Sequence, residues 1–169
     1  MRTPANIKGH PIHPMLVTIP IGLWIFSLVT DLVGLRSAAP GTWHVVALYA
    51  MVGGIAGALA AALPGLVDLL SIQDRTIKRT GIAHMSLNLT IVALYAVNAW
   101  LRWSGAAVAG LPLALSLIAI AMLLVSGWLG GKMVYLAGVG VSSESPAAAP
   151  PLRRMAQQQQ QRPGQRQHE

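Results

Sequence analysis

The chain has 169 residues, of which 54% are hydrophobic and only 10% are charged, and it contains no cysteine. A soluble domain of this size would carry roughly a quarter charged residues, so the composition excludes an ordinary water-soluble fold and indicates a polytopic membrane protein. The lack of cysteine excludes disulfides, thiolate metal sites, iron–sulfur clusters and a cysteine nucleophile. The net charge of +7 must then reflect topology or partners.

Four apolar stretches are each long enough to cross about 30 Å of hydrocarbon, which takes roughly 20 helical residues. They cover residues 15–35, 45–70, 82–101 and 106–131. We therefore expect an all-α fold, a four-transmembrane-helix bundle over residues 1–141. The segment 142–169 is rich in Pro, Ala and Gln, and its composition predicts a disordered basic tail.

The distribution of basic residues predicts the topology, because Lys and Arg in short loops are retained on the cytoplasmic side. Ten of the twelve lie before the first span, between the second and third spans, or after the fourth, and only Arg36 and Arg102 fall on the other side. We expect a multi-pass protein of the bacterial cytoplasmic (inner) membrane with both termini in the cytoplasm. The positive charge then indicates topology and attraction to the anionic lipids of the bilayer, and not nucleic acid binding.

Small residues mark expected helix contacts. Gly53 and Gly57 in the second span, and Gly127 and Gly131 in the fourth, have the four-residue spacing that lets membrane helices approach closely. We expect these glycines to pack against neighbouring helices, although the pair in the fourth span could also admit a bulky ligand.

Polar side chains within the spans fall on two stripes. His13 and Asp31 are 18 residues apart on the first span, and His84 and Arg102 are 18 residues apart on the third. Eighteen residues make five helical turns, so each pair lies on one face. If the two faces meet, Asp31 pairs with Arg102 near the outer surface while His13 meets His84 near the inner one. The alternative is that Asp31 and Arg102 each reach their own interface. The repeated spacing also raises the hypothesis of a tandem duplication of helices one-two and three-four.

Candidate ligands gather at the inner side of the bundle. His10, His13 and His84 with Asp68 could form a metal site, or two of the histidines could be axial ligands of haem b. A proton-handling or quinone-adjacent site is a further interpretation. The structural alternative is that His10 and His13 anchor the helix start while Asp68 pairs with a basic loop residue such as Arg75.

Several stretches resemble the DUF2231 family of uncharacterised bacterial membrane proteins. They are GHPIHPMLVTIPIG at residues 9–22, Asp31, GLVD at 65–68, His84 with Asn88, SGWLGGKMVY at 126–135 and GVGV at 138–141. Some members of this family are fused to Rieske-type or cytochrome c-like domains, which implies an electron-transfer context. The resemblance implies no catalytic residues.

These observations predict a redox-associated subunit that binds haem b or a metal through the inner histidines and works with a redox partner protein or quinone. No hydrolase or nucleotide-binding motif is present, so we expect no independent catalytic activity. One alternative is a non-catalytic scaffold or partner-binding subunit. Another is a small transporter, which would need to be an oligomer. Its path would be lined by the polar stripe, namely Asp31, Asn88, Tyr95, Asn98 and Arg102.

Overall fold

The structure, a computed structural model, describes residues 4–140. Its elements in chain order are β1 (Asn6–Ile7), β2 (His10–Pro11), α1 (Ile12–Leu16), α2 (Thr18–Gly34), α3 (Pro40–Ser71), α4 (Arg75–Trp103) and α5 (Leu111–Tyr135). With α1 and α2 counted as one span, this part of the chain has four helical stretches long and apolar enough to cross a membrane. The predicted all-α, four-span fold is confirmed. The predicted tail at 142–169 lies outside the described residues.

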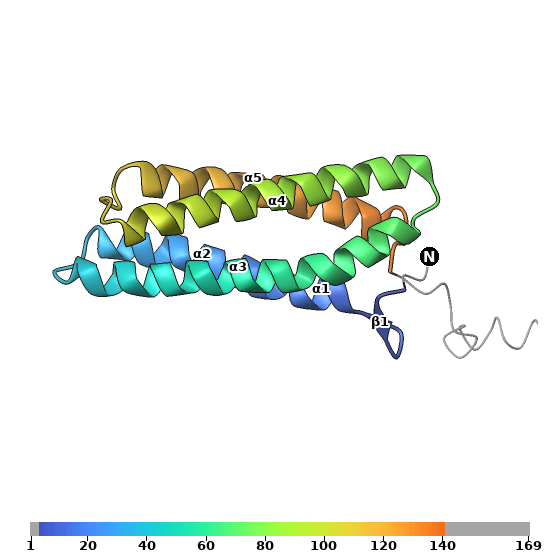
Figure 1. Ribbon diagram of the computed structural model, residues 1–169, viewed down its shortest axis with the longest axis horizontal. Coiled ribbons are helices and arrows are strands. Elements are labelled where there is room, and N and C mark those ends of the chain that lie inside the picture. The colour runs from blue at the N-terminus through green and yellow to red at the C-terminus, as the bar shows by residue number, and fades with distance from the viewer. Residues whose placement is uncertain (1–3, 141–169) are drawn as a thin grey trace, which may run out of the picture.

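The helices form two hairpins that lie side by side along their length (Figure 1). The first consists of α1, α2 and α3, and the second of α4 and α5. One end of the bundle holds the start of the chain, the α3–α4 connection and the end of α5, and we name it the histidine end. The opposite end holds the α2–α3 and α4–α5 loops, and we name it the ion-pair end.

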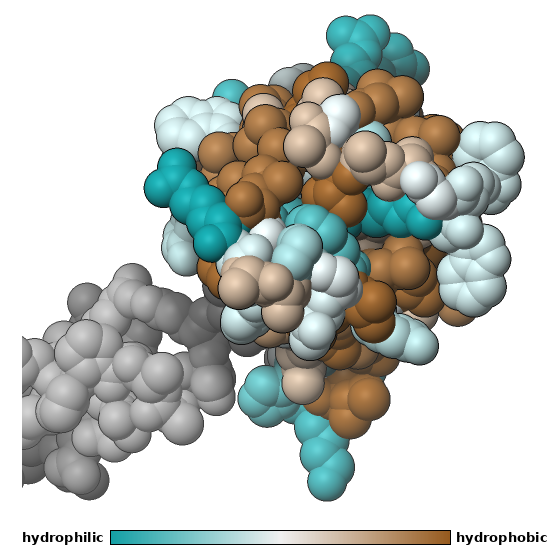
Figure 2. Space-filling view, turned by 90° about the vertical axis from the view of Figure 1, so that its left-hand side faces the viewer, coloured by the Kyte–Doolittle hydropathy of each residue, from teal (hydrophilic) through white to brown (hydrophobic). Residues whose placement is uncertain are grey.

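The outward faces of the helices are apolar. Large hydrophobic side chains on them are more than 45% exposed, including Phe26, Tyr49, Leu63, Leu124 and Val125. Figure 2 looks onto the ion-pair end and shows mainly hydrophobic residues, with hydrophilic ones near the centre and at a few points on the outline. Such a surface suits hydrocarbon and not water, because apolar patches of this extent are rare on soluble monomers.

Local chemistry explains where the helices differ from the predicted spans. The third span, α4, begins at Arg75 and not at the predicted residue 82. The Asp74 carboxylate caps it by accepting the Thr76 and Ile77 N–H groups at 2.8 and 2.9 Å. The fourth begins at Leu111 rather than 106, since the chain still turns at Gly105, where φ is +88°. The first span is interrupted at Val17, four residues after His13, because Pro20 has no N–H to bond the Leu16 carbonyl.

The core lies where the two hairpins meet. Trp24 on α2 stacks on Tyr95 of α4 with ring centroids 4.5 Å apart, and its indole N–H donates to the Met51 carbonyl at 3.3 Å. Gly54 on α3 is required here, because a Cβ at this position would collide with the Trp24 indole. A Cβ added at Gly53 or Gly57 would come within 3.2 or 2.9 Å of side chains of α2, so these two glycines do let the helices pack closely as expected.

Candidate functional site

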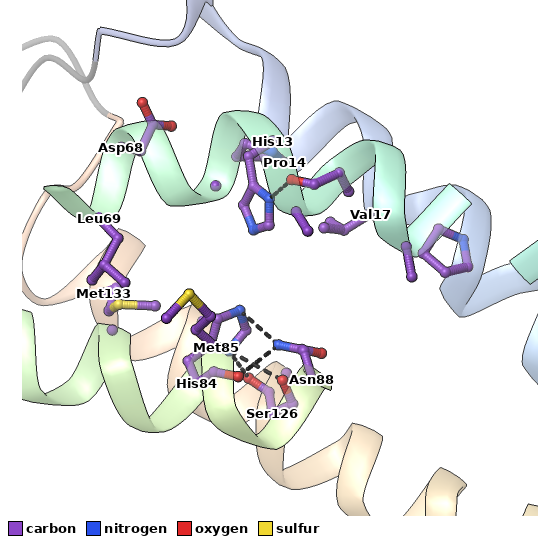
Figure 3. Close-up of a pocket in the computed structure, with 18 of the residues that line it drawn as sticks. His13, Pro14, Val17, Asp68, Leu69, His84, Met85, Asn88, Ser126 and Met133 are labelled. Carbon is purple, nitrogen blue, oxygen red and sulfur yellow. Dashed lines mark hydrogen bonds between the residues drawn. The ribbon is translucent and has the colours of Figure 1, made fainter. Parts of the chain in front are cut away.

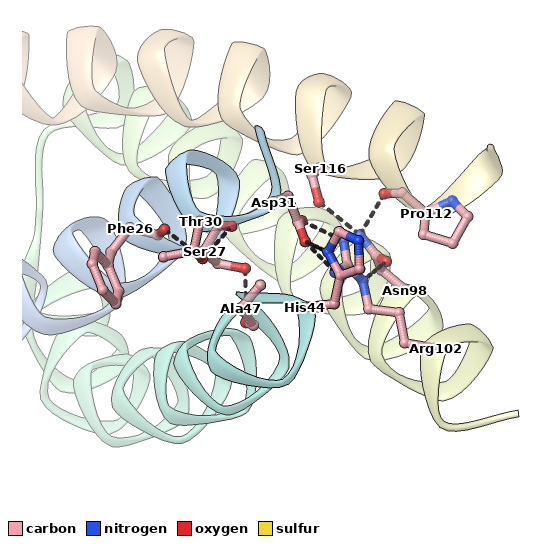
Figure 4. Close-up of polar contacts among 10 residues, drawn as sticks. All are labelled: Phe26, Ser27, Thr30, Asp31, His44, Ala47, Asn98, Arg102, Pro112 and Ser116. Carbon is pink, nitrogen blue, oxygen red and sulfur yellow. Dashed lines mark hydrogen bonds and ion pairs between the residues drawn. The ribbon is translucent and has the colours of Figure 1, made fainter. Parts of the chain in front are cut away.

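Asp31 of α2 and Arg102 of α4 join the hairpins at the ion-pair end. The guanidinium donates from Nη1 and Nη2 to the two carboxylate oxygens at 2.7 and 2.6 Å (Figure 4). The side chains are only 0% and 4% exposed. The predicted pairing is therefore confirmed, and the alternative in which each group reaches its own interface is wrong.

Neighbouring side chains extend this ion pair to all four long helices. Asn98 accepts from Arg102 Nε at 2.9 Å and donates to the Pro112 carbonyl and to Ser116 Oγ on α5, both at 2.8 Å. On α3, His44 Nδ1 lies 3.4 Å from Asp31 Oδ1. With Tyr95 and Asn98 fully buried, these members of the polar stripe bond and pack within the bundle instead of lining a path through it.

At the histidine end, His13 of α1 is held by the second helix of its own hairpin. Its Nδ1 lies 2.8 Å from the Ala61 carbonyl oxygen. A carbonyl can only accept, so Nδ1 carries the proton and Nε2 of the neutral ring keeps its lone pair. The ring lies against Gly65, where a Cβ would come within 2.7 Å of Nδ1.

His84 of α4 is held in the same way by α5. Its Nδ1 lies 3.0 Å from the Ser126 carbonyl oxygen and 3.1 Å from Ser126 Oγ, and its ring lies against Gly130. The amide of Asn88 donates to His84 Nε2 at 3.1 Å and to the His84 carbonyl at 2.8 Å. Accepting from Asn88 requires a lone pair on Nε2, which is the same protonation state that the Ser126 carbonyl imposes.

The two imidazoles face one another across the gap between the hairpins (Figure 3). Their ring centroids are 6.3 Å apart and their planes are nearly perpendicular, at 88°. The predicted convergence of His13 and His84 is confirmed. Two unprotonated nitrogens aimed into one gap constitute a site for a Lewis acid or a hydrogen-bond donor.

A cavity of about 370 Å³ surrounds the two rings, which lies within the size range of cofactor and small-molecule pockets. Three of its lining leucines, Leu59 and Leu66 on α3 and Leu89 on α4, are also exposed. The cavity therefore reaches the outer surface of the bundle, where lipid would lie.

Gly127 and Gly131 line this cavity instead of packing against a helix. A Cβ at either position would meet no atom within 4 Å. The expectation that they form a helix-packing contact is corrected on this point, because of the three glycines only Gly130 lies against α4, where a Cβ would meet the His84 ring at 3.3 Å. The open wall fits the interpretation that this end of the fourth span admits a bulky ligand.

His10 and Asp68 do not join the two facing histidines as ligands. His10 lies exposed on β2, in the short hairpin before α1, and is not among the residues lining the cavity. Asp68 lines the cavity, but its carboxylate accepts the Ala5 N–H at 2.9 Å and so holds down the start of the chain, rather than pairing with Arg75 as the structural alternative had it. Within residues 4–140 no group of three or more His, Cys, Asp or Glu side chains is placed to hold a metal ion. The interpretation of three histidines and Asp68 as one metal site is therefore corrected.

A family model described as a predicted membrane protein, DUF2231, matches residues 9–143. The chain belongs to the DUF2231 family. No curated protein and no solved structure matches it. Both clusters of this DUF2231 protein lie inside the matched segment, from His13 at one end of the bundle to Arg102 at the other.

Sequence reasoning missed the groups that orient the histidines. These are the Ala61 and Ser126 carbonyls and the glycines at 65 and 130 on which the rings lie. At the ion-pair end, the approach of His44 to Asp31 was missed as well. One signal could have found the first four: each carbonyl is followed four residues later by a glycine, once on α3 and once on α5.

Proposed function

We propose that this DUF2231 protein is a redox-associated membrane subunit that holds haem b between His13 and His84. One observation carries the proposal: two imidazoles from different hairpins face each other with Nε2 unprotonated and centroids 6.3 Å apart. A metal bonded to two imidazole nitrogens at about 2 Å each places the ring centroids about 6 Å apart. A hydroquinone ring is too long to bridge two imidazoles whose centroids are 6.3 Å apart.

The orientation of the two rings would suit both histidines as ligands of the haem iron. In metal sites a ligating histidine usually donates its other ring N–H to a carbonyl or carboxylate, which fixes the tautomer and aims the ligating nitrogen. The Ala61 and Ser126 carbonyls accept from Nδ1 of His13 and His84 in this way. The open glycine wall at Gly127 and Gly131 leaves space for a flat macrocycle beside the rings.

The charge balance of the cavity favours haem over a bare divalent ion. Its two imidazoles bring no negative charge, and its carboxylate, Asp68, is engaged by the Ala5 N–H. A divalent cation there would remain uncompensated in an apolar setting, which is costly. A porphyrin brings two negative charges of its own to the iron. Held by His13 and His84, haem would supply one-electron transfer.

The basic residues support an orientation with the histidine end toward the cytoplasm. Lys8, the group at Arg75, Lys78 and Arg79, and Lys132 lie at that end, whereas Arg36 lies at the other. In a bacterial inner membrane the haem would then sit near the cytoplasmic face, within reach of a redox partner protein or a quinone.

An absorption spectrum of the full chain, expressed with excess haem and purified in detergent, tests the proposal. We expect about one haem per chain with a low-spin, six-coordinate spectrum. His13→Ala and His84→Ala should each abolish that spectrum, whereas the matched controls His10→Ala and His44→Ala should keep it. A haem-free wild-type protein, or binding that survives loss of both facing histidines, would overturn the assignment in favour of a scaffold.

A further inference from the structure

We infer that the two hairpins are copies of one unit, that the histidine pocket lies on the axis relating them, and that Asn88 is the residue that makes the two imidazoles unequal. The inference rests on the proposed function for the identity of the ligand, haem b. The symmetry and the role of Asn88 are argued from contacts that need no ligand.

The first helices of the two hairpins correspond at a fixed separation of 71 positions. Three pairs with this separation meet each other at successive levels of the bundle. They are His13 with His84 at 6.3 Å between centroids, Trp24 with Tyr95 at 4.5 Å, and Asp31 with Arg102 in the ion pair. Residues that touch their own counterparts are what a two-fold axis between two copies produces.

The second helices correspond at a separation of 65 positions, and the bonds within each hairpin repeat at this shift. His13 Nδ1 bonds the Ala61 carbonyl, and its counterpart His84 Nδ1 bonds the carbonyl of Ser126. Each ring then lies against the glycine four residues further on, Gly65 or Gly130.

A second bond, at the ion-pair end, repeats in the same register. Ser27 Oγ donates to the Ala47 carbonyl at 2.8 Å, and its counterpart Asn98 donates to the Pro112 carbonyl at 2.8 Å. One pair of shifts therefore accounts for hydrogen bonds and ring contacts at both ends of the molecule. Since α2 and α4 both run from the histidine end to the ion-pair end, the axis lies along the bundle, as in membrane proteins built from parallel repeats.

The pairs on the axis differ in a way that points to a shared ligand. Two identical charges facing each other in the buried position of Asp31 and Arg102 would repel, and here the pair consists of opposite charges. The histidine pair is identical. Two identical ligating groups on an axis can both bind one central atom. The symmetry therefore assigns a single ligand shared by His13 and His84, and it would be held equally if the surroundings of the two rings were the same.

Asn88 breaks this equality. It follows His84 by one helical turn and donates to its Nε2, and its counterpart four residues after His13 is Val17, which lines the same cavity. Among residues 4–140 no hydrogen-bond partner meets His13 Nε2, so a ligand would find this nitrogen free but must displace an amide hydrogen bond at His84. We assign to Asn88 a placeholder role: its amide occupies His84 Nε2 when no ligand is bound, holds the ring in position and competes with the ligand for that nitrogen.

Two reciprocal substitutions in the full chain test this assignment: Asn88→Val removes the placeholder, and Val17→Asn installs its counterpart. The first measurement is ¹⁵N NMR of histidine-labelled protein in detergent without haem. His13 and His84 should both show the Nδ1–H tautomer. Asn88→Val should move only the His84 Nε2 signal, and Val17→Asn only that of His13. If Val17→Asn leaves His13 unmoved, or if either ring carries its proton on Nε2, the inferred equivalence is wrong.

The second measurement is a titration of the same variants with haemin. A hydrogen bond that must be broken costs about 0.5–1.5 kcal/mol, so Asn88→Val should tighten haemin binding by about two- to tenfold, and Val17→Asn should weaken it by a similar factor. Weaker binding by Asn88→Val would overturn the placeholder role. If neither the wild type nor any variant binds haemin, the proposed function fails. The NMR signals still test, without haemin, whether the two rings share one tautomer and whether Asn88 bonds His84 Nε2.

Discussion

Arg102→Leu is the substitution with the largest expected effect on stability. It leaves the Asp31 carboxylate at a position where its side chain is 0% exposed. Removing one partner of a buried ion pair costs about 3–5 kcal/mol, because the other charge stays buried and uncompensated. The short Asp31 side chain cannot reach water from its buried position, and of its charged neighbours only His44, at 3.4 Å, would remain, so we expect a loss within that range.

The substitution of the other partner, Asp31→Leu, should lower the free energy of unfolding by less than Arg102→Leu does. Arg102 lies near the end of α4, keeps its bond to Asn98 at 2.9 Å, and has a long stem that can carry the guanidinium to the head groups. The double variant Asp31→Leu/Arg102→Leu removes both charges and should recover most of the loss, since buried ion pairs can often be replaced by apolar residues at little cost.

Equilibrium unfolding in mixed detergent micelles, followed by the fluorescence of the five tryptophans, measures these differences. Arg36→Leu is a matched control, because this arginine lies at the same end of the bundle but is exposed. The expected order of stability is wild type, double variant, Asp31→Leu and Arg102→Leu. If Arg102→Leu is no less stable than the double variant, Asp31 is not held as a buried charge and the ion pair does not clamp the hairpins.

Three further substitutions test the packing described above. Gly54→Val should lower stability by about 1–3 kcal/mol in the same unfolding assay, because the added side chain displaces Trp24 from its stack, whereas Gly22→Ala, which meets no atom within 4 Å, should not. Tyr95→Phe should leave stability unchanged or raise it by about 1 kcal/mol, because the buried hydroxyl has no hydrogen-bond partner among residues 4–140, and a clear loss would reveal a partner. Gly131→Leu should reduce haemin binding without lowering stability, because it fills open space in the cavity wall, and unchanged binding would place the ligand elsewhere.

The fold and the facing of the two stripes could be predicted because both depend on periodicity. Charge-free stretches define the spans, and 18 residues between a histidine and a charge define a face. Burial of an ionisable group in a bilayer is costly enough that such faces must turn toward each other. That cost makes the pairing of Asp31 with Arg102 and the approach of His13 to His84 predictable, and the 0% and 4% exposure of the ion pair excludes the alternative that each charge reaches its own interface.

The role of the second helix in each hairpin could not be predicted in the same way. Every residue has a carbonyl, so the acceptors at Ala61 and Ser126 are marked only indirectly, by the glycine four residues after each, and their use depends on the register between helices. His10 and His13 are equally suitable as ligands in the sequence, and the turn at Lys8 and Gly9, both with positive φ, is what leaves His10 exposed on its hairpin. The glycines at 127 and 131 match a packing motif, yet the rotation of α5 presents Gly130 to His84 instead.

The two ends of the bundle differ because the residue pair at one end can form hydrogen bonds across the interface by itself, and the pair at the other end cannot. Asp31 and Arg102 satisfy each other through two hydrogen bonds and close their end of the interface. His13 and His84 hold the same Nδ1 protonation state, so neither Nε2 can donate to the other, and two acceptors facing each other do not attract. The interface therefore closes at the ion-pair end and stays open at the histidine end, where an electron-pair acceptor between the rings would supply the contact that the imidazoles cannot make on their own.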